Sequence, residues 1–237
     1  MEIDRAYDPP SSQPGDEPVE QLKAAAAQAA AALVEDGMSV GLGTGSTVAH
    51  LLPALARRKL SGLRCVATSP ATESQALALG LSIVSLEDVE GRLDIAIDGA
   101  DQVSPTGWLI KGGGGAHTRE KIVAAAASRF VVIISAEKLV TRLGPPIPLE
   151  LLRFGLSASM RALEPTQLRE APPSPDGNLI ADYLGPIDDP HALAALLSAT
   201  PGVVEHGLFA PQMVSEVLVG EPEGVRLLPG AKHTPQA

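Results

Sequence analysis

Short apolar runs alternate with longer alanine- and leucine-rich segments through residues 19–135. Runs rich in Val and Ile are typical of buried strands, and the longer segments are typical of helices. The pattern predicts strands at Met38–Leu42, Leu63–Thr68, Leu81–Ser85, Leu93–Ile97 and Phe130–Ser135. It predicts helices at Val19–Val34, Ser46–Arg58, Ala71–Leu79 and Ala116–Ser128. Strands that alternate with helices of this length indicate an α/β fold with a doubly wound, mostly parallel, Rossmann-like sheet.

The alternation stops at Leu143–Pro148, where the sequence LGPPIP holds three prolines. Proline-rich segments interrupt helices and strands and mark connections between domains. Beyond this point the sequence predicts a turn at Ser174–Asn178, a strand at Leu179–Tyr183 and a helix at Pro190–Ser198. We expect these elements to form a second, smaller α+β domain.

Further strands are expected at Leu208–Phe209 and Val214–Val219. We therefore predict four parts of the chain: a disordered leader (1–18), a Rossmann-like domain (19–145 and about 205–229), a small α+β domain (146–204) and a frayed tail (230–237). The leader is acidic and Pro-rich and has no apolar run, which is typical of a disordered segment and not of a signal peptide.

Composition and charge narrow the classes of function. The formal net charge of the 237-residue chain is −10, which argues against a nucleic-acid binder and against binding to an anionic membrane surface. Cys65 is the only cysteine, so no intrachain disulfide can form and a reducing, cytoplasmic setting is favoured. The five histidines are scattered without HExxH or CxxC spacing, so the sequence predicts no metal site.

The segment GLGTGST (Gly41–Thr47) lies between a predicted strand and a predicted helix. Its glycines allow close approach, and the N–H groups at a helix N-terminus bind anions. The dinucleotide pattern G-x-G-x-x-G fails at Ser46, and no Lys follows the last Gly as it would in a nucleotide phosphate loop. The hydroxyls of Thr44, Ser46 and Thr47 instead suit a sugar phosphate. The alternative is a tight turn in which Ser46 caps the helix.

Two more segments follow predicted strands or precede a helix. DGAD (Asp98–Asp101) carries two carboxylates that can bind hydroxyls or a metal or transfer a proton, unless Asp101 only caps a local turn. KGGGGAHTREK (Lys111–Lys121) begins with a glycine run that disfavours helix and strand. The run indicates a backbone loop that closely approaches a ligand such as an oxyanion, or else a flexible hinge. Lys111 and Glu120 flank this loop, and we interpret His117 as a residue that supports the site from behind or only packs there.

These segments are expected to meet, because ligands of an open parallel sheet bind beyond the carboxyl ends of its strands. Ser135–Lys138 also follows a strand and adds Lys138. The result is one crevice with anion donors, two Asp, one Glu and two Lys. A carboxylate base beside cations suits proton abstraction next to a sugar carbonyl. Aldose–ketose isomerisation can also proceed by metal-assisted hydride transfer, but the sequence shows no clustered metal ligands and we favour proton transfer.

In order and spacing, GLGTGST, DGAD, KGGGGA-x-x-REK and Glu137–Lys138 resemble the type A ribose-5-phosphate isomerase family. The resemblance extends from about Leu22 to Leu228. It implies an aldose-ketose isomerase that interconverts D-ribose 5-phosphate and D-ribulose 5-phosphate through an enediol in the non-oxidative pentose phosphate pathway. It also implies an enzyme without metal or cofactor that forms a homodimer or a dimer of dimers.

The same resemblance assigns roles to individual residues. Glu120 resembles the general base, and Asp98 the carboxylate that assists ring opening. Asp101 resembles its sugar-binding neighbour, and Lys111 the cation that stabilises the enediolate. The residues implied in binding the phosphate and the sugar are Lys23, Gly43, Thr44, Gly45, Ser46, Thr47, Gly112, Gly113, Gly114 and Lys138.

The chain departs from the family pattern at three positions. Gln102 follows DGAD where the family commonly has Glu, Pro70 lies in an unusual place, and His117 replaces a residue that is usually apolar.

Three other classes of function stay open at this point. A sugar-phosphate sensor of a transcription regulator needs a helix-turn-helix segment, which the Pro-rich leader cannot form. The second class is another isomerase or a coenzyme A transferase of similar architecture, and a transferase needs a carboxylate nucleophile in a different motif. A nucleotide-dependent dehydrogenase needs the glycine pattern that Ser46 interrupts.

Overall fold

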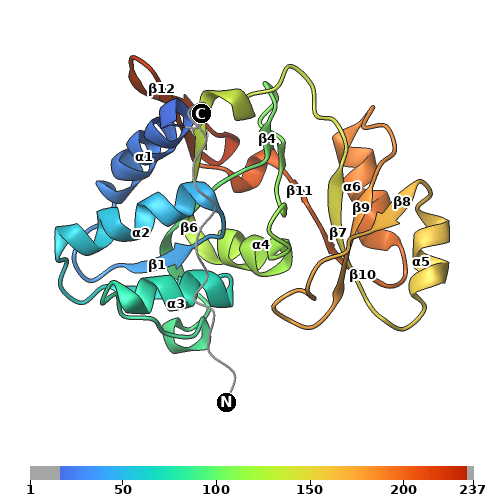
Figure 1. Ribbon diagram of the computed structural model, residues 1–237, viewed down its shortest axis with the longest axis horizontal. Helices are drawn as coiled ribbons and strands as arrows, with labels where there is room; N and C mark the ends of the chain where they lie inside the picture. Colours follow the sequence, from blue (N-terminus) through green and yellow to red (C-terminus); the bar gives the residue numbers. More distant parts are fainter. Residues whose placement is uncertain (1–16, 234–237) are drawn as a thin grey trace.

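The computed structural model describes residues 17–233. It is built around a six-stranded sheet, which lies among helices α1 to α4 (Figure 1). The strand order is β13-β12-β6-β3-β1-β2. The strands of this sheet are β1 (Ser39–Leu42), β2 (Arg64–Ala67), β3 (Leu93–Asp98), β6 (Ala127–Ser135), β12 (Glu216–Glu221) and β13 (Gly224–Pro229). All neighbours are parallel except the antiparallel β12–β13 hairpin. The predicted α/β fold with a mostly parallel sheet is therefore confirmed.

Helices cover both faces of this sheet. They are α1 (Glu17–Ala31), α2 (Ser46–Arg58), α3 (Pro70–Ala78) and α4 (His117–Ala126). Successive residues of β6 enter opposite cores: Val131 and Ile133 pack with α1 and α2, whereas Val132 and Ile134 pack in the cluster that includes Val123 of α4. Because side chains alternate across a strand, a continuous apolar run in β6 is what a sheet buried on both faces requires.

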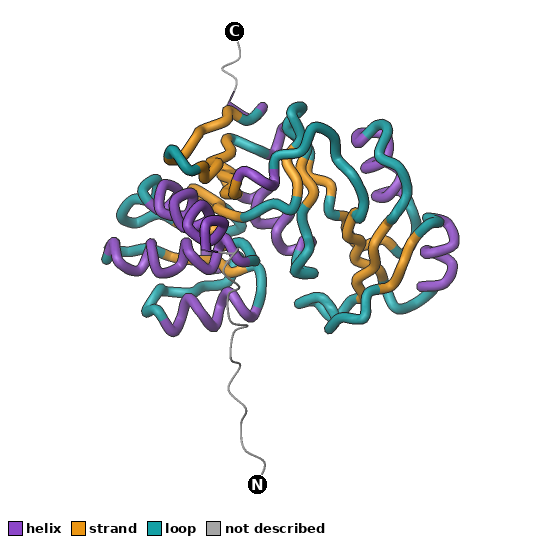
Figure 2. The backbone as a smooth tube through the Cα atoms, turned by 45° about the horizontal axis from the view of Figure 1, so that its top comes forward, coloured by secondary structure: helices purple, strands orange, loops and turns teal. Residues whose placement is uncertain are grey.

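A smaller antiparallel sheet lies to one side of the main sheet (Figures 1 and 2). Its strand order is β10-β7-β9-β8. Its elements are β7 (Ile147–Leu151), α5 (Leu156–Ala162), β8 (Thr166–Leu168), β9 (Leu179–Tyr183), α6 (Pro190–Ala199) and β10 (Val203–His206). A separate apolar core that includes Leu149, Ala181 and Leu197 holds them together. The residue limits of the two domains stay predictions.

Short elements connect these parts. A three-stranded antiparallel sheet, β11-β5-β4, is formed by β4 (Gln102–Val103), β5 (Leu109–Ile110) and β11 (Leu208–Phe209). Single 3-10 turns are η1 (Glu87–Val89), η2 (Ala136–Lys138), η3 (Pro211–Met213) and η4 (Ala231–His233). No helix between residues 17 and 233 combines the length and the apolar character needed to cross a membrane.

Several predicted boundaries are wrong. Leu81–Ser85 forms no strand, since only Ile83 makes an isolated bridge to Cys65. α1 ends at Ala31, three residues before the predicted end, and α4 ends at Ala126. β6 begins at the next residue, because Ala127 already pairs with Leu93 of β3.

The predicted frayed tail is wrong for its described part. β13 pairs with β12 as far as Pro229, and η4 follows it. The Lys232 Nζ donates a hydrogen bond to the Ala127 carbonyl oxygen at 2.8 Å, so this segment is held on the main sheet. Residues 1–16 of the predicted leader and 234–237 of the tail lie outside the described residues, whereas Glu17 and Pro18 belong to α1.

Candidate active site

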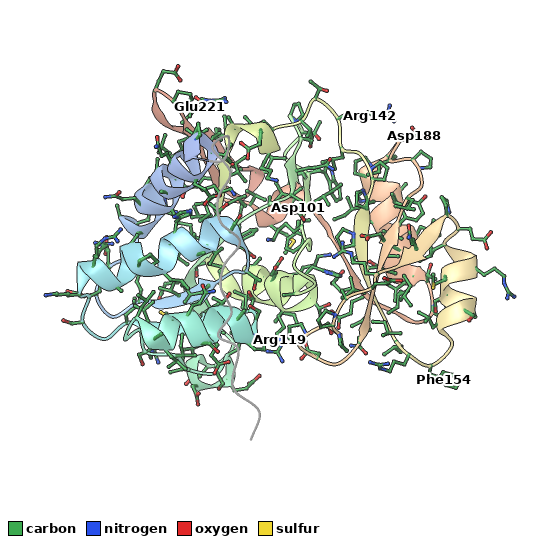
Figure 3. All side chains as sticks on the ribbon, in the orientation of Figure 1. Asp101, Arg119, Arg142, Phe154, Asp188 and Glu221 are labelled. Atoms are coloured by element: carbon green, nitrogen blue, oxygen red, sulfur yellow. The ribbon has the colours of Figure 1, made fainter. Side chains whose placement is uncertain are left out.

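A cavity of about 230 Å³ lies where segments following β1, β3, β5 and β6 meet. Asp101, near the centre of the molecule in Figure 3, belongs to its wall. The residues that line the cavity are Thr44, Gly45, Ser46, Thr47, Gly99, Ala100, Asp101, Lys111, Gly112, Gly113, Gly114, Glu120 and Lys138. The sequence therefore predicted most of this wall, because strand ends of a parallel sheet share one edge.

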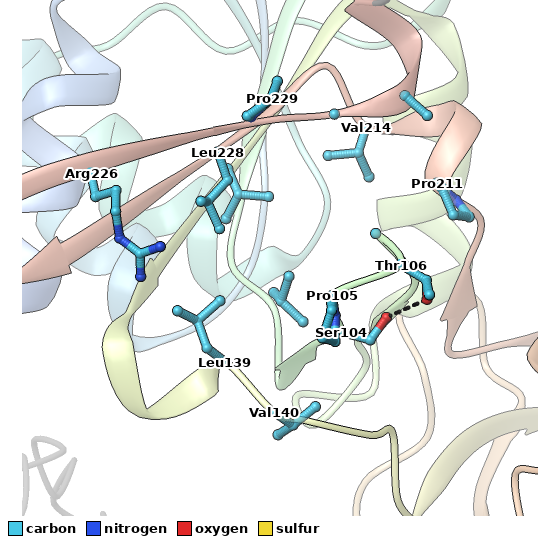
Figure 4. A pocket seen from close by; sticks show the side chains of 15 residues that line it. Ser104, Pro105, Thr106, Leu139, Val140, Pro211, Val214, Arg226, Leu228 and Pro229 are labelled. Carbon is cyan, nitrogen blue, oxygen red and sulfur yellow. Dashed lines mark hydrogen bonds between the residues drawn. The ribbon is translucent and has the colours of Figure 1, made fainter.

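Larger cavities lie elsewhere in the described structure. One of about 680 Å³, between the β4–β5 turn and the β12–β13 hairpin, is lined mainly by apolar side chains such as Leu139, Val214 and Leu228 (Figure 4). Another, of about 750 Å³, lies beside the exposed face of α4. Neither of these two cavities is lined by a predicted site residue. The volume of a cavity therefore does not identify the active site in this protein, whereas the convergence of charged groups does.

Lys111 is the centre of a buried charge cluster. Its Nζ lies 2.8 Å from Asp98 Oδ2 and 3.0 Å from Glu120 Oε2, and it donates a hydrogen bond to the Gly99 carbonyl oxygen at 2.6 Å. The side chains of Lys111, Asp98 and Glu120 are only 2%, 4% and 2% exposed. The Lys111 ammonium also lies 5.4 Å from the centre of the Phe209 ring. Two carboxylates therefore share one ammonium group in a dry environment.

This arrangement shifts all three pKa values. Burial raises the pKa of Glu120 to about 8, and repulsion from Asp98 adds to the rise against the attraction of Lys111. Burial also raises the pKa of Asp98, although Lys111 opposes it. For Lys111, burial alone lowers the pKa, but the attraction of both carboxylates outweighs it and the pKa is raised. One ammonium cannot neutralise two buried carboxylates, so one of them holds its proton unusually strongly.

Glu120 is buried but reaches the cavity from the first turn of α4. Its Oε2 makes no directed hydrogen bond among the described residues, although Lys111 lies within ion-pair distance. The Glu120 side chain is therefore part of the cavity wall, with its Oε2 buried and held by the charge of Lys111 alone. This geometry suits a general base.

The two Asp residues of DGAD differ in what they contact. Asp98 Oδ1 accepts hydrogen bonds from the Thr44 N–H at 3.2 Å and the Gly99 N–H at 2.7 Å, behind the cavity wall. A Cβ at Gly43 would lie 1.9 Å from Asp98 Cγ, so only glycine fits there. Asp101 is exposed, and its Oδ2 accepts the Gly113 N–H at 2.9 Å. Asp101 therefore holds the glycine loop and does not merely cap its own turn.

The GLGTGST loop ends in an uncapped helix N-terminus. The residue before α2 is Gly45, with φ of 132°, and no side chain caps the helix. The alternative in which Ser46 caps α2 is therefore wrong, and the first N–H groups of α2 lack intrahelical acceptors. Lys138 also lines the cavity, and it has no ion-pair partner among residues 17–233. Free donors and an unpaired ammonium group together suit an anion.

Two threonines that we did not predict support this loop. Thr68 Oγ1 lies 2.8 Å from Thr44 Oγ1, and Thr72 Oγ1 donates to the Gly43 carbonyl oxygen at 2.8 Å. Both belong to the hydroxyl-rich TSPATES segment that follows β2. The signal that could have identified them was a fourth polar segment after a strand of the same sheet, beside those that follow β1, β3 and β6.

Lys23 does not line the cavity, unlike the other predicted cations. Its Nζ lies 2.6 Å from Glu20 Oε1 within α1. Glu20 Oε2 also lies 2.7 Å from His50 Nε2 of α2. An anion would have to compete with Glu20 for this ammonium group.

The three departures from the family pattern have structural explanations. Gln102 exchanges two hydrogen bonds with the Gly144 backbone, at 2.8 and 2.9 Å. Pro70 is the first residue of α3, directly after the capping Ser69, a position that favours proline. His117 is fully buried, and burial lowers its pKa to about 4. A Cβ at Gly112 would lie 2.7 Å from His117 Nδ1, which agrees with a packing residue.

Known proteins resemble this chain over nearly its whole length. The family model for ribose 5-phosphate isomerase A (phosphoriboisomerase A) matches residues 64–224. The ribose-5-phosphate isomerase A of Rhodopseudomonas palustris (strain BisB18) is 44% identical over 88% of this chain and 97% of its own. The corresponding protein of Caulobacter vibrioides (strain NA1000 / CB15N) is 48% identical over 85% of this chain and 95% of its own.

Solved structures of the same family also resemble this chain. Ribose 5-phosphate isomerase A from Methanocaldococcus jannaschii superposes with a TM-score of 0.84 at 39% identity, covering 89% of this chain and 99% of that one. A D-ribose-5-phosphate isomerase in complex with phospho-erythronic acid has the same TM-score and coverage at 37% identity. With the motifs, the fold and both kinds of similarity in agreement, the chain belongs to the ribose 5-phosphate isomerase A family.

Proposed function

We propose that this protein interconverts D-ribose 5-phosphate and D-ribulose 5-phosphate by proton transfer through an enediolate. One observation carries the proposal: the buried Asp98–Lys111–Glu120 cluster borders the same cavity as an uncapped helix N-terminus and the unpaired Lys138. The cavity thus combines a base, an oxyanion-stabilising cation and groups that can bind a phosphate.

In this mechanism the phosphate is bound by Lys138, Ser46, Thr47 and the first N–H groups of α2. The Glu120 carboxylate takes the proton from C2 of the open-chain aldose, and the C1 carbonyl oxygen becomes the enediolate oxygen beside the Lys111 ammonium. Glu120 then returns the proton to C1, while the proton of the C2 hydroxyl moves to O1 and leaves the C2 ketone. The net change moves one hydrogen from C2 to C1 and one from O2 to O1.

The other predicted residues support these steps. Asp98 holds Lys111 in place and assists ring opening. Asp101 binds the sugar hydroxyls and orients the glycine loop through Gly113. The raised pKa of Glu120, about 8, suits a base that must both accept and return a proton near neutral pH. Preorganised charge such as that of Lys111 contributes a few kcal/mol to stabilising a developing oxyanion.

The test is conversion of D-ribose 5-phosphate with excess chelator, for the wild-type protein and Glu120→Gln. We expect chelator-resistant turnover in the wild type and a kcat lower by about 10²- to 10⁴-fold in the variant, with KM changed little. Glu164→Gln, at an exposed carboxylate of the small sheet region, is the control and should keep wild-type turnover. Loss of activity with chelator would contradict the metal-free route. Tight sugar-phosphate binding without turnover would support the sensor alternative.

We further propose that the enzyme works as a homodimer in the cytoplasm, as the family resemblance implies. The single cysteine, Cys65, is buried, and burial raises the pKa of its thiol to about 12, which suits a protein without disulfide chemistry. Light scattering of the purified protein would test the dimer, and a monomeric mass at assay concentration would contradict it.

A further inference from the structure

Arg169 connects the small sheet to the glycine loop of the cavity. It follows the edge strand β8, and its Nη1 donates hydrogen bonds to the carbonyl oxygens of Gly112 at 3.1 Å and Gly113 at 3.0 Å. Its Nε and Nη2 donate to the two carboxylate oxygens of Asp182 on β9, at 2.7 and 2.6 Å. Both side chains are 19% exposed. The guanidinium group therefore has one side on a carboxylate and the other on two peptide carbonyls.

This contact determines which way the glycine peptides face. In a trans peptide the C=O and N–H groups point in opposite directions. With both carbonyls directed at Arg169, the N–H groups of Gly113 and Gly114 face away from it. The Gly113 N–H donates to Asp101. The Gly114 N–H has no acceptor in the protein among residues 17–233, and Gly114 lines the cavity. It is a free donor at the site.

A glycine run needs such external support, because glycine has more accessible backbone conformations than any other residue. Within the loop, the Gly115 N–H bonds the Gly112 carbonyl at 3.0 Å, but nothing internal to the loop orients the Gly113–Gly114 peptide. Hydrogen bonds from a charged guanidinium are stronger than neutral ones, and they also polarise the peptide that they contact.

We propose that Arg169, anchored by Asp182, is a positioning residue for the isomerisation: it fixes the Gly112–Gly114 peptides so that the Gly114 N–H stays directed at a substrate oxygen. Arg169 itself touches no substrate. The inference rests on the proposed function for its catalytic consequence. A lysine cannot replace it fully, because a single ammonium group lacks the planar fork that holds a carboxylate and two carbonyls at once.

The experiment compares Arg169→Met and Arg169→Lys with Arg129→Met. Arg129 forms an ion pair with Glu216 at the far end of β6, so its loss matches the loss of an Arg–carboxylate pair without touching the loop. For each protein we would measure kcat and KM with D-ribose 5-phosphate, the thermal midpoint, and amide hydrogen exchange of residues 111–116 by mass spectrometry.

We expect Arg169→Met to lower kcat by about 10- to 100-fold, as small misplacements at a reacting centre do, with KM within about threefold. Exchange of the loop amides should become faster. Arg169→Lys should recover part of kcat, and Arg129→Met should keep both kcat and loop exchange whatever its thermal midpoint. If Arg169→Met does not fold, Asp182→Asn replaces it, with a smaller loss of kcat expected in the same direction.

The proposal is overturned if Arg169→Met keeps kcat within twofold, if loop exchange is unchanged, or if Arg129→Met loses as much kcat. Failure of the proposed function looks different. In that case the wild-type protein does not convert D-ribose 5-phosphate, while the exchange comparison still decides whether Arg169 orders the loop.

Discussion

The Asp98–Lys111–Glu120 cluster and the loop at the N-terminus of α2 share one cavity but differ in burial and pairing. Every charged group of the cluster is at most 4% exposed and has an opposite charge within 3.0 Å. In the loop, Gly45 and Ser46 are exposed. Lys138, which lines the same cavity, is half-buried without an ion-pair partner in the described part of the chain.

The difference agrees with the task that we propose for each region. Groups whose protonation must change during a reaction gain from burial, because low polarity strengthens their mutual interactions and shifts their pKa values. Groups that only bind a phosphate must exchange it with water, so exposed donors without protein partners serve better. Substitutions in the two regions should therefore have different effects. A substitution in the cluster should lower both turnover and stability, whereas one in the loop should weaken only substrate binding.

Lys111→Met should have the largest effect. It removes the cation of the cluster, so kcat should fall by about 10²- to 10³-fold. Unfolding at pH 8 should become easier by about 3 kcal/mol, because two buried carboxylates lose their partner. The destabilisation should shrink at pH 5. Without Lys111 the folded carboxylates bind protons up to higher pH than the unfolded ones, so stability falls as pH rises.

Urea unfolding at both pH values would check this, and equal losses at pH 5 and pH 8 would contradict it. Lys121→Met is a matched control: Lys121 is partly buried, pairs with Glu205 at 2.7 Å and lies over the same Phe209 ring. The Lys121→Met variant should keep kcat within about threefold of the wild-type value.

The pH dependence of the wild-type enzyme should give the next largest effect. With the Glu120 pKa near 8, kcat/KM should rise about tenfold per pH unit below that value and level off above it. The free energy of unfolding should instead decrease as the pH rises. The unfolded chain loses this proton near pH 4.5 and the folded one near pH 8, so Glu120 lowers stability as pH rises between them. Glu120→Gln should remove this slope. A flat rate profile from pH 6.5 to 9 would contradict the assignment.

Lys138→Met should raise KM for D-ribose 5-phosphate by about 10- to 100-fold, since a hydrogen bond to a charged group contributes roughly 1.5–3 kcal/mol. kcat should change little. The free energy of unfolding should stay within about 0.5 kcal/mol, because Lys138 has no ion pair to lose. Steady-state kinetics and urea unfolding check both points, with Lys59→Met as a control for net charge at a remote, exposed site. A substantial loss of stability would show that the two regions are not separate.

Ser46→Ala should have the smallest effect, a rise in KM of about 2- to 10-fold from one lost hydroxyl contact. The stability of the protein should not change, because Ser46 does not cap α2. Thermal unfolding beside the kinetics would check this. A lower thermal midpoint in the variant would mean that the hydroxyl supports the helix after all.

Much of the fold could be predicted because the main sheet is buried on both faces. An uninterrupted apolar run such as Phe130–Ile134 is then interpreted as a buried strand, and the loops that directly follow the parallel strands lie at one edge of the sheet. The elements at the edges of the main sheet were harder to predict. Residues of β13 such as Val225 and Leu227 are exposed, so no periodicity marks them, and only pairing with β12 makes them a strand. Leu81–Ser85 looks like a strand locally but has room for a single bridge.

The sequence by itself determined the residue types at the cavity, because a glycine-rich turn, a carboxylate pair and a Gly run each place a chemical group next to a strand end. The tertiary structure alone decided how these groups are paired. It placed Lys111 between two carboxylates, kept Lys23 on Glu20, and brought Arg169 from the small sheet to the glycine loop. The pairing of charged groups depends on distances between segments that are far apart in the chain. The burial of these pairs then sets their pKa values. A local sequence pattern therefore predicts neither the pairing nor the pKa values.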